Sequence, residues 1–253
     1  MDKGTVSGIP AWKRGLLVGI LGLAAVGAAA GFRGSREEAG GGKVLEADLE
    51  ETEGSAGKVS EKIREPLEET KKIALTFDDG PHRVYTERLL DGLKERGVKV
   101  TFFLLGSNIE GKEEIVKRMS EEGHLIGNHT FYHVDITKLE PEEASAEILD
   151  TSRRITDITG QPVEYVRPPF GNWDKELEGD VTMIPIFWTV DTLDWTTGNA
   201  DQIVQKVVTS VEENDIILMH DSYDSTVQAA LRIIDLLQAE GYEFVTADEL
   251  ILE

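Results

Sequence analysis

Two adjacent carboxylates and a spaced pair of histidines are the side chains in this sequence best suited to hold a metal ion. Asp78 and Asp79 stand in the run TFDDG, and His129 and His133 bracket the run HTFYH. One carboxylate oxygen and two imidazole nitrogens are a set that a hydrolytic zinc ion uses when it keeps a position open for water or substrate. Four-residue spacing would place both imidazoles on one side of a helix. A charged Asp-Gly turn and an exposed histidine pair are the structural alternatives.

Three further runs carry groups that could transfer protons or bind a polar ligand. They are RPPF beginning at Arg167, DTLDW from Asp191 to Trp195, and LMH ending at His220. Two prolines after Arg167 fix an extended backbone and remove two amide donors. Taken singly, each run has a structural alternative. Arg167 could be a surface arginine in a turn, the run from Asp191 to Trp195 could be a capped turn, and His220 could be a core histidine.

Strand and helix patterns alternate from Lys72 to the C-terminus. Strands are predicted over residues 72–77, 98–105, 124–127, 164–166, 183–190, 215–219 and 243–246. Helices are predicted over residues 85–96, 112–122, 141–159, 201–213 and 226–239, with Pro141 in a first turn and glycines just past several helix ends. Such alternation predicts parallel strands with crossover helices, and the number of units indicates a barrel. Because the candidate residues follow predicted strands, they should meet where barrels carry their chemistry.

The five runs occur in the order, and with the residue types, of a known family. From about residue 72 to 253 the chain resembles the polysaccharide deacetylases that share the NodB homology domain, carbohydrate esterase family four. Within that family it is most similar to bacterial peptidoglycan N-acetylglucosamine deacetylases. The resemblance implies an α/β fold, a distorted (β/α) barrel with about seven parallel strands. It also implies a metal-dependent hydrolase acting on a linear amide.

The resemblance assigns the metal ligands and the base. Asp79, His129 and His133 would hold one divalent ion, with zinc expected first and cobalt or another divalent ion as the alternative. Asp78 would be the general base, kept ionised by the opposite charge of Arg167.

The same resemblance assigns the acid and the substrate contacts. His220 would be the general acid, oriented and charged by Asp194. Trp195 and Leu218 would form the walls of the pocket for the acetyl methyl group. The backbone amide of Phe170 would contribute to the oxyanion hole. Tyrosine is commoner than phenylalanine at that position, and a backbone role does not depend on the difference.

Composition limits the other partners. The formal net charge is −22, which argues against nucleic acid as a ligand because nucleic-acid-binding surfaces are basic. Cysteine is absent, so neither a disulfide nor a thiolate site can form. No pattern specifies an oligomeric state.

The N-terminal region differs from the rest. Residues 1–33 contain an uncharged apolar run, from Gly15 to Phe32, preceded by Lys13 and Arg14. This run is long enough for a membrane-spanning helix of ~17–25 residues, and its basic flank predicts a catalytic domain outside the cytoplasm. A cleaved signal ending near Ala30 is the alternative, giving a secreted protein. Residues 34–71 form a Gly- and Glu-rich stretch predicted to be a flexible linker, and residues 72–253 would be the catalytic domain.

An anchored domain of this family would meet a polymer just outside the membrane. N-acetylglucosamine in peptidoglycan is therefore the first expected substrate. Chitooligosaccharides, N-acetylmuramic acid and O-acetyl xylan are the alternatives within the family. A non-catalytic glycan-binding protein is the alternative from another class, and Asp78, Asp194 and His220 argue against it because binding alone does not need them.

Overall fold

A computed structural model describes residues 70–173, 175 and 181–252. The predicted anchor or signal, residues 1–33, and residues 34–69 of the predicted linker lie outside this part. Within it, no helix has the length and apolar character needed to cross a membrane. The domain boundaries stay a prediction.

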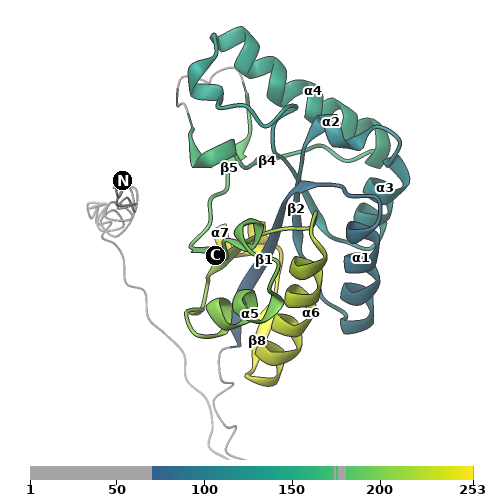
Figure 1. The fold of residues 1–253 in the computed structure, drawn as a ribbon. Coiled ribbons are helices and arrows are strands. Elements are labelled where there is room, and N and C mark those ends of the chain that lie inside the picture. Colours follow the sequence, from purple (N-terminus) through teal and green to yellow (C-terminus); the bar gives the residue numbers. More distant parts are fainter. Residues whose placement is uncertain (1–69, 174, 176–180, 253) are drawn as a thin grey trace, which may run out of the picture. The chain divides into compact units, whose positions relative to one another are not determined.

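Eight parallel strands form one sheet (Figure 1). They are β1 (Lys71–Gly80), β2 (Thr101–Leu104), β3 (Leu125–Asn128), β4 (Tyr165–Val166), β5 (Ile184–Pro185), β6 (Val190–Asp191), β7 (Ile216–His220) and β8 (Tyr242–Phe244). Seven follow the order β5-β4-β3-β2-β1-β7-β6, and β8 pairs with the start of β1. In the described part no ladder joins β5 to β6, so the barrel is open there. The predicted distorted barrel of parallel strands is confirmed.

Helices pack against the strands of the sheet. They are α1 (Tyr85–Arg96), α2 (Gly106–Ile109), α3 (Glu113–Glu121), α4 (Pro141–Thr159), α5 (Ala200–Val208), α6 (Asp224–Ala239) and α7 (Ala247–Ile251), with short 3-10 turns η2 (Ile136–Lys138), η3 (Pro169–Gly171) and η5 (Asp194–Thr196). Helix α1 contacts α3 and α6 along one flank (Figure 1). The predicted bounds of α1 and α4 are confirmed, and each ends at a left-handed glycine, Gly97 and Gly160. The short helices α2 and α7 were not predicted, and α5 ends earlier than predicted.

The side chains of β1 point alternately into two different core clusters. Alternate residues of a strand point to opposite faces. Ile73, Leu75 and Phe77 pack in one core cluster with residues of α1 and α6. Ala74 belongs instead to a cluster that includes Phe103 of β2 and Ile216 of β7. This alternation gives Thr76 and Asp78 the second environment, away from α1 and α6.

One predicted strand is wrong in its extent. Residues 183–190 form two short strands, β5 and β6, rather than one. Pro185 has no amide to donate, which limits pairing at that point. The carbonyl oxygens of Ile186 and Phe187 accept hydrogen bonds from the Arg167 guanidinium, at 3.2 Å and 3.3 Å. Part of the backbone between the two strands therefore binds a site residue.

Candidate active site

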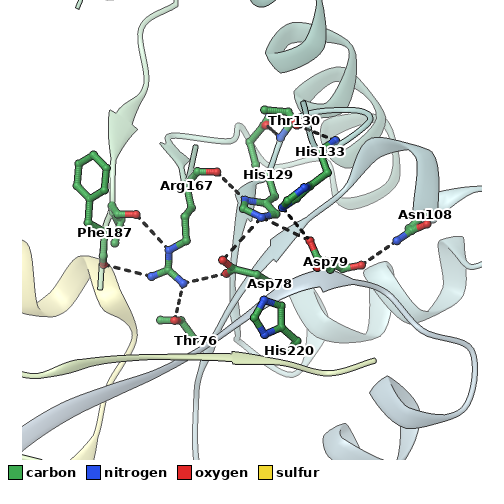
Figure 2. A network of polar contacts seen from close by, with 12 residues as sticks. Thr76, Asp78, Asp79, Asn108, His129, Thr130, His133, Arg167, Phe187 and His220 are labelled. Carbon is green, nitrogen blue, oxygen red and sulfur yellow. Dashed lines mark hydrogen bonds and ion pairs between the residues drawn. The ribbon is translucent and has the colours of Figure 1, made fainter. Parts of the chain in front are cut away.

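The predicted site residues meet at the carboxyl ends of the strands (Figure 2). Asp78 of β1 pairs directly with His220, the last residue of β7. His129 follows β3, and Arg167 follows β4. They surround a pocket of about 370 Å³ whose lining residues are Asp78, Asp79, His129, His133, Phe170, Trp188, Asp191, Trp195, Leu218, His220 and Tyr223. Arg167 is buried behind this surface.

Asp79, His129 and His133 form a candidate metal site. One ligand atom from each residue lies within 4.8 Å of the other two. The Asp79 Oδ1 atom is 3.5 Å from His129 Nε2 and 3.7 Å from His133 Nε2. These contacts are longer than hydrogen bonds, as expected for atoms that face a common centre rather than each other.

The chemistry of the ligand atoms fits a divalent cation. Asp79 Oδ1 is buried and has no hydrogen-bond partner, which is costly unless a cation approaches it. His129 Nδ1 lies 2.6 Å from the carbonyl oxygen of Arg167. A carbonyl only accepts, so Nδ1 carries the proton and Nε2 keeps its lone pair for a metal. Burial lowers the pKa of His129 in spite of the nearby carboxylates, which favours the neutral form that a ligand needs.

The backbone at Asp79 has an unusual conformation that brings its side chain into the pocket. Its φ is 70°, in the left-handed region, and the pairing of β1 with β2 shifts register between Asp78 and Gly80. The Asn108 side chain of α2 donates a 2.8 Å hydrogen bond to the Asp79 carbonyl oxygen (Figure 2). Asn108 was not predicted as a site residue, because it lies in a four-residue helix with no sequence signal.

The histidine segment is not helical, contrary to the helical reading of its spacing. Thr130 and His133 both have positive φ, 66° and 57°. The Asn128 side chain accepts a hydrogen bond from the Thr130 amide at 2.7 Å. Thr130 Oγ1 in turn accepts from the His133 amide at 3.1 Å. These side-chain acceptors replace the carbonyls of a helix and turn both imidazoles toward Asp79.

Glu147 of α4 completes the support of this loop. Its Oε2 atom accepts hydrogen bonds from the amides of Phe131 and Tyr132, at 2.9 Å and 2.8 Å. These amides lie between the two histidine ligands. Glu147 was not predicted either, because its separation from the loop in sequence hides the contact.

Asp78 and Arg167 form a buried ion pair. Arg167 donates from one nitrogen to Asp78 Oδ1 at 2.8 Å and to Thr76 Oγ1 at 2.6 Å. Burial lowers the pKa of the Arg167 guanidinium, while the charge of Asp78 raises it. The other oxygen, Asp78 Oδ2, lies 3.7 Å from His129 Nε2 and so faces the metal ligands. The two oxygens of Asp78 thus have separate environments.

His220 and Asp194 form the second charged pair. His220 Nδ1 is 2.8 Å from Asp194 Oδ1, and Asp194 Oδ2 accepts from the His220 amide and from Thr226 Oγ1, both at 2.7 Å. Burial opposes the charged imidazole, but the hydrogen bond and charge of Asp194, with the charges of Asp78 and Asp79, raise the pKa of His220 to about 9. Burial also favours neutral Asp194, yet its hydrogen bonds hold the pKa of that carboxyl below its ordinary value.

The predicted substrate contacts lie at the pocket surface. Phe170 is 64% exposed, and its ring meets the His133 ring edge-on with centroids 4.8 Å apart. Trp195 is 57% exposed, whereas Leu218 is buried. The two histidines left out of the predicted site, His82 and His124, do not line the pocket.

Comparisons with known proteins identify related sequences and structures. A family profile described as polysaccharide deacetylase matches residues 67–183. The peptidoglycan-N-acetylglucosamine deacetylase PgdA of Listeria monocytogenes is 41% identical over 180 residues, which span 71% of this chain and 39% of that protein. The structure of the peptidoglycan deacetylase PdaC from Bacillus subtilis has a TM-score of 0.70 and 40% identity, covering 72% of this chain and 90% of that chain.

A third relative is matched over most of its length. A chitooligosaccharide deacetylase of a Bradyrhizobium species is 33% identical over 192 residues, which are 69% of this chain and 88% of that protein. Sequence, fold and pocket therefore agree, and the chain belongs to the polysaccharide deacetylase family.

Proposed function

We propose that this protein is a zinc-dependent deacetylase that removes N-acetyl groups from a cell-wall polysaccharide, first of all from N-acetylglucosamine in peptidoglycan. One observation carries the proposal. A three-residue metal-ligand set, a carboxylate paired with Arg167 and an imidazole paired with Asp194 all line or support one pocket. A protein that only binds glycans needs neither charged pair.

Asp78 is proposed as the general base. Its Oδ1 atom is held by Arg167, and its Oδ2 atom faces the ligand set, so Oδ2 is the atom that accepts a proton from the attacking water. The charge of Arg167 favours the ionised carboxylate that this step needs. A divalent ion bound by the three ligands would polarise both the amide carbonyl and the water.

His220 is proposed as the general acid. Its Nδ1 atom is bonded to Asp194, so Nε2 is the atom that gives a proton to the departing amine. The raised pKa of His220 keeps the ring protonated at neutral pH. The backbone amide of Phe170 is assigned to the developing oxyanion, where one donor contributes about 3 kcal/mol in comparable sites. Trp195 and Leu218 are assigned to the acetyl methyl group.

The substrate choice is supported by the relatives. The names of the Listeria and Bacillus proteins specify peptidoglycan. The Bradyrhizobium name specifies chitooligosaccharides, which are therefore the second candidate. N-acetylmuramic acid and O-acetyl xylan are the remaining candidates.

A product assay tests this proposal. The zinc-loaded protein would be incubated with peptidoglycan, chitooligosaccharides and acetylated xylan, and the products analysed by mass spectrometry. We expect free amines on glucosamine residues of peptidoglycan. Deacetylation of xylan alone would reject the amide substrate. Absence of product from every glycan, with metal bound, would favour a glycan-binding protein.

The N-terminal segment, residues 1–33, is proposed to anchor the protein in the cell membrane with the catalytic part outside. The apolar run and its basic flank support this placement. Secretion after signal cleavage is the alternative. Sequencing the mature N-terminus from the membrane fraction separates the two, because a start at Gly31 would indicate cleavage.

A further inference from the structure

Asp221 is a buried carboxyl group beside the candidate active site that the proposed reaction does not use. It directly follows His220, the last residue of β7, and its side chain is fully buried. Its Oδ1 atom has no hydrogen-bond partner, and burial raises the pKa of the group to about 7. A carboxyl group in such a position is costly and calls for a physical explanation. Asp221 does not line the metal pocket, so it does not contact a substrate there.

The Asp221 carboxyl group packs against the backbone of Gly80, the residue after the candidate metal ligand Asp79. A β-carbon at Gly80 would lie 3.0 Å from Asp221 Oδ2 and 2.8 Å from Oδ1, and the second distance is shorter than real contacts of this kind. Gly80 is not among the residues with a left-handed backbone. Glycine is therefore needed here because the carboxyl group occupies the space that a side chain would fill.

A chain of hydrogen bonds links Asp221 to the same segment a second time. Asp221 Oδ2 accepts a hydrogen bond from the hydroxyl of Thr86, a fully buried residue near the start of α1. Thr86 Oγ1 accepts in turn from the amide of His82 at 2.7 Å. A hydroxyl has one proton and two lone pairs, so it can serve both partners at once. Asp221 thus holds the segment from Gly80 to His82 at both ends.

These contacts lie where the pairing of β1 with β7 stops. The last paired residues are Asp78 and His220. Beyond this pair, the register of the two strands no longer fixes one chain against the other. Asp79 therefore depends on other contacts for its place. The Asn108 side chain holds its carbonyl oxygen at 2.8 Å, and Asp221 packs against the residue that follows it.

We propose that Asp221 is a positioning residue that fixes the backbone after Asp79 relative to His220. It thereby sets the place of a metal ligand relative to the general acid. The carboxyl group acts through its size and its acceptor oxygen, because the cationic side chains of the site, Arg167 and His220, already pair with other carboxylates. The inference rests on the proposed metal-dependent function and adds to it a residue outside the pocket.

Zinc affinity and kinetics of Asp221 variants test this role. Asp221→Ala should weaken zinc binding about tenfold in competition with a chelating dye, because the backbone beside a ligand loses its support. At saturating zinc it should lower kcat on a soluble chitooligosaccharide while KM changes little, because Asp221 does not line the pocket. Asp221→Asn keeps the size and an acceptor oxygen, so it should stay within about threefold of the unaltered protein in zinc affinity and in kcat.

Thr86→Val tests the role without altering Asp221. It removes the hydroxyl and keeps most of the volume, and it should weaken zinc binding about threefold to tenfold through the lost hydrogen bond. Thr101→Val is the matched control. Thr101 is also fully buried and its Oγ1 atom also accepts from an amide, that of Ala247 at 2.9 Å, but it lies at the start of β2. Both variants should lower Tm, and only Thr86→Val should change zinc affinity.

Gly80→Ala tests the direct contact. Alone it should weaken zinc binding. Combined with Asp221→Ala it should cost less than the sum of the two single effects, because the new methyl group occupies space that the carboxyl group leaves. Additive effects would overturn the contact on which the role depends.

Unchanged zinc affinity in Asp221→Ala and Thr86→Val, with only Tm lowered, would overturn the positioning role. So would an Asp221→Asn variant as impaired as Asp221→Ala. If Asp221→Ala does not fold, the comparison of Thr86→Val with Thr101→Val decides. An unaltered protein that binds zinc but deacetylates no glycan would reject the proposed deacetylase function, and the zinc affinities of the variants would still decide the role of Asp221.

Discussion

Asp194→Asn should move the alkaline limb of the pH profile of kcat/KM. The substituted amide would keep the shape of the side chain but not the charge that helps to raise the pKa of His220 to about 9. Without that charge, burial still opposes the charged imidazole while the charges of Asp78 and Asp79 still favour it, and the pKa of His220 falls toward the ordinary histidine value of about 6.5. The acid must be protonated, so the alkaline limb should move to lower pH, by up to about two units.

The size of the loss should depend on pH in a way that can be calculated. With a pKa of about 9, roughly nine tenths of His220 is protonated at pH 8, whereas with a pKa of about 6.5 only ~3% is. Loss of protonation alone therefore lowers kcat/KM by up to about thirtyfold at pH 8. At pH 6 both forms are mostly protonated, and the loss from this cause is less than about twofold. Any defect that remains at pH 6 reports poorer orientation of the ring.

The assay is a kcat/KM profile on one soluble oligomer at constant ionic strength, with bound metal measured at each pH. Thr226→Ala is the matched control, because it removes a neutral hydrogen bond to Asp194 and leaves the carboxylate in place. Its alkaline limb should move much less. An unchanged alkaline limb in Asp194→Asn would refute the reasoning, since His220 would then not be the acid that Asp194 charges.

Three further predictions follow from the site. Asp79→Asn should lose metal affinity while Asp78→Asn keeps the metal and loses most activity, as measured by elemental analysis and kcat; equal metal loss would show that the roles are divided wrongly. Glu147→Ala should weaken zinc binding about tenfold to a hundredfold, because loss of hydrogen bonds that support metal ligands has an effect of this size. Competition with a chelating dye measures the affinity. Glu143→Ala on the same helix should leave zinc binding unchanged. Arg167→Met should lower the free energy of unfolding by about 3–5 kcal/mol, because Asp78 is left buried without its partner; adding Asp78→Asn should restore part of the loss, and additive effects would argue against the pair.

Much of the fold was predictable because its signals are local. Helix α4 carries Pro141 in its first turn and ends at Gly160, and both bounds follow from these two residues. Strands β1, β2 and β7 are mostly buried runs whose positions follow from hydrophobicity. What could not be predicted depends on residues far apart in sequence. The interruption between β5 and β6 is one case, because the carbonyl oxygens of Ile186 and Phe187 bind Arg167.

The same distinction holds for the candidate site. Side chains that meet the pocket themselves, such as Asp79 and His129, were predicted from their chemistry and their position after strands. Asn108 and Glu147 were not, because each acts on the backbone of another segment. A hydrogen bond from a side chain to a distant peptide group leaves no pattern of residue type and spacing. The supporting residues of a site are therefore harder to predict than the residues they support.

The backbone at Asp79 explains how two adjacent carboxylates can serve one pocket. In a regular strand, neighbouring side chains point to opposite faces, so Asp79 would face the helices if Asp78 faced the pocket. The left-handed conformation at Asp79 and the register shift beside it break this alternation. Such a conformation costs on the order of 1–3 kcal/mol for most residues, and aspartate, asparagine and histidine adopt it more readily than others. The other ligand in this conformation is His133, with a φ of 57°. Residue types that bind metals thus also tolerate the backbone that directs them toward a common centre, and Asp79→Asn changes the charge of the ligand without forcing the backbone to change.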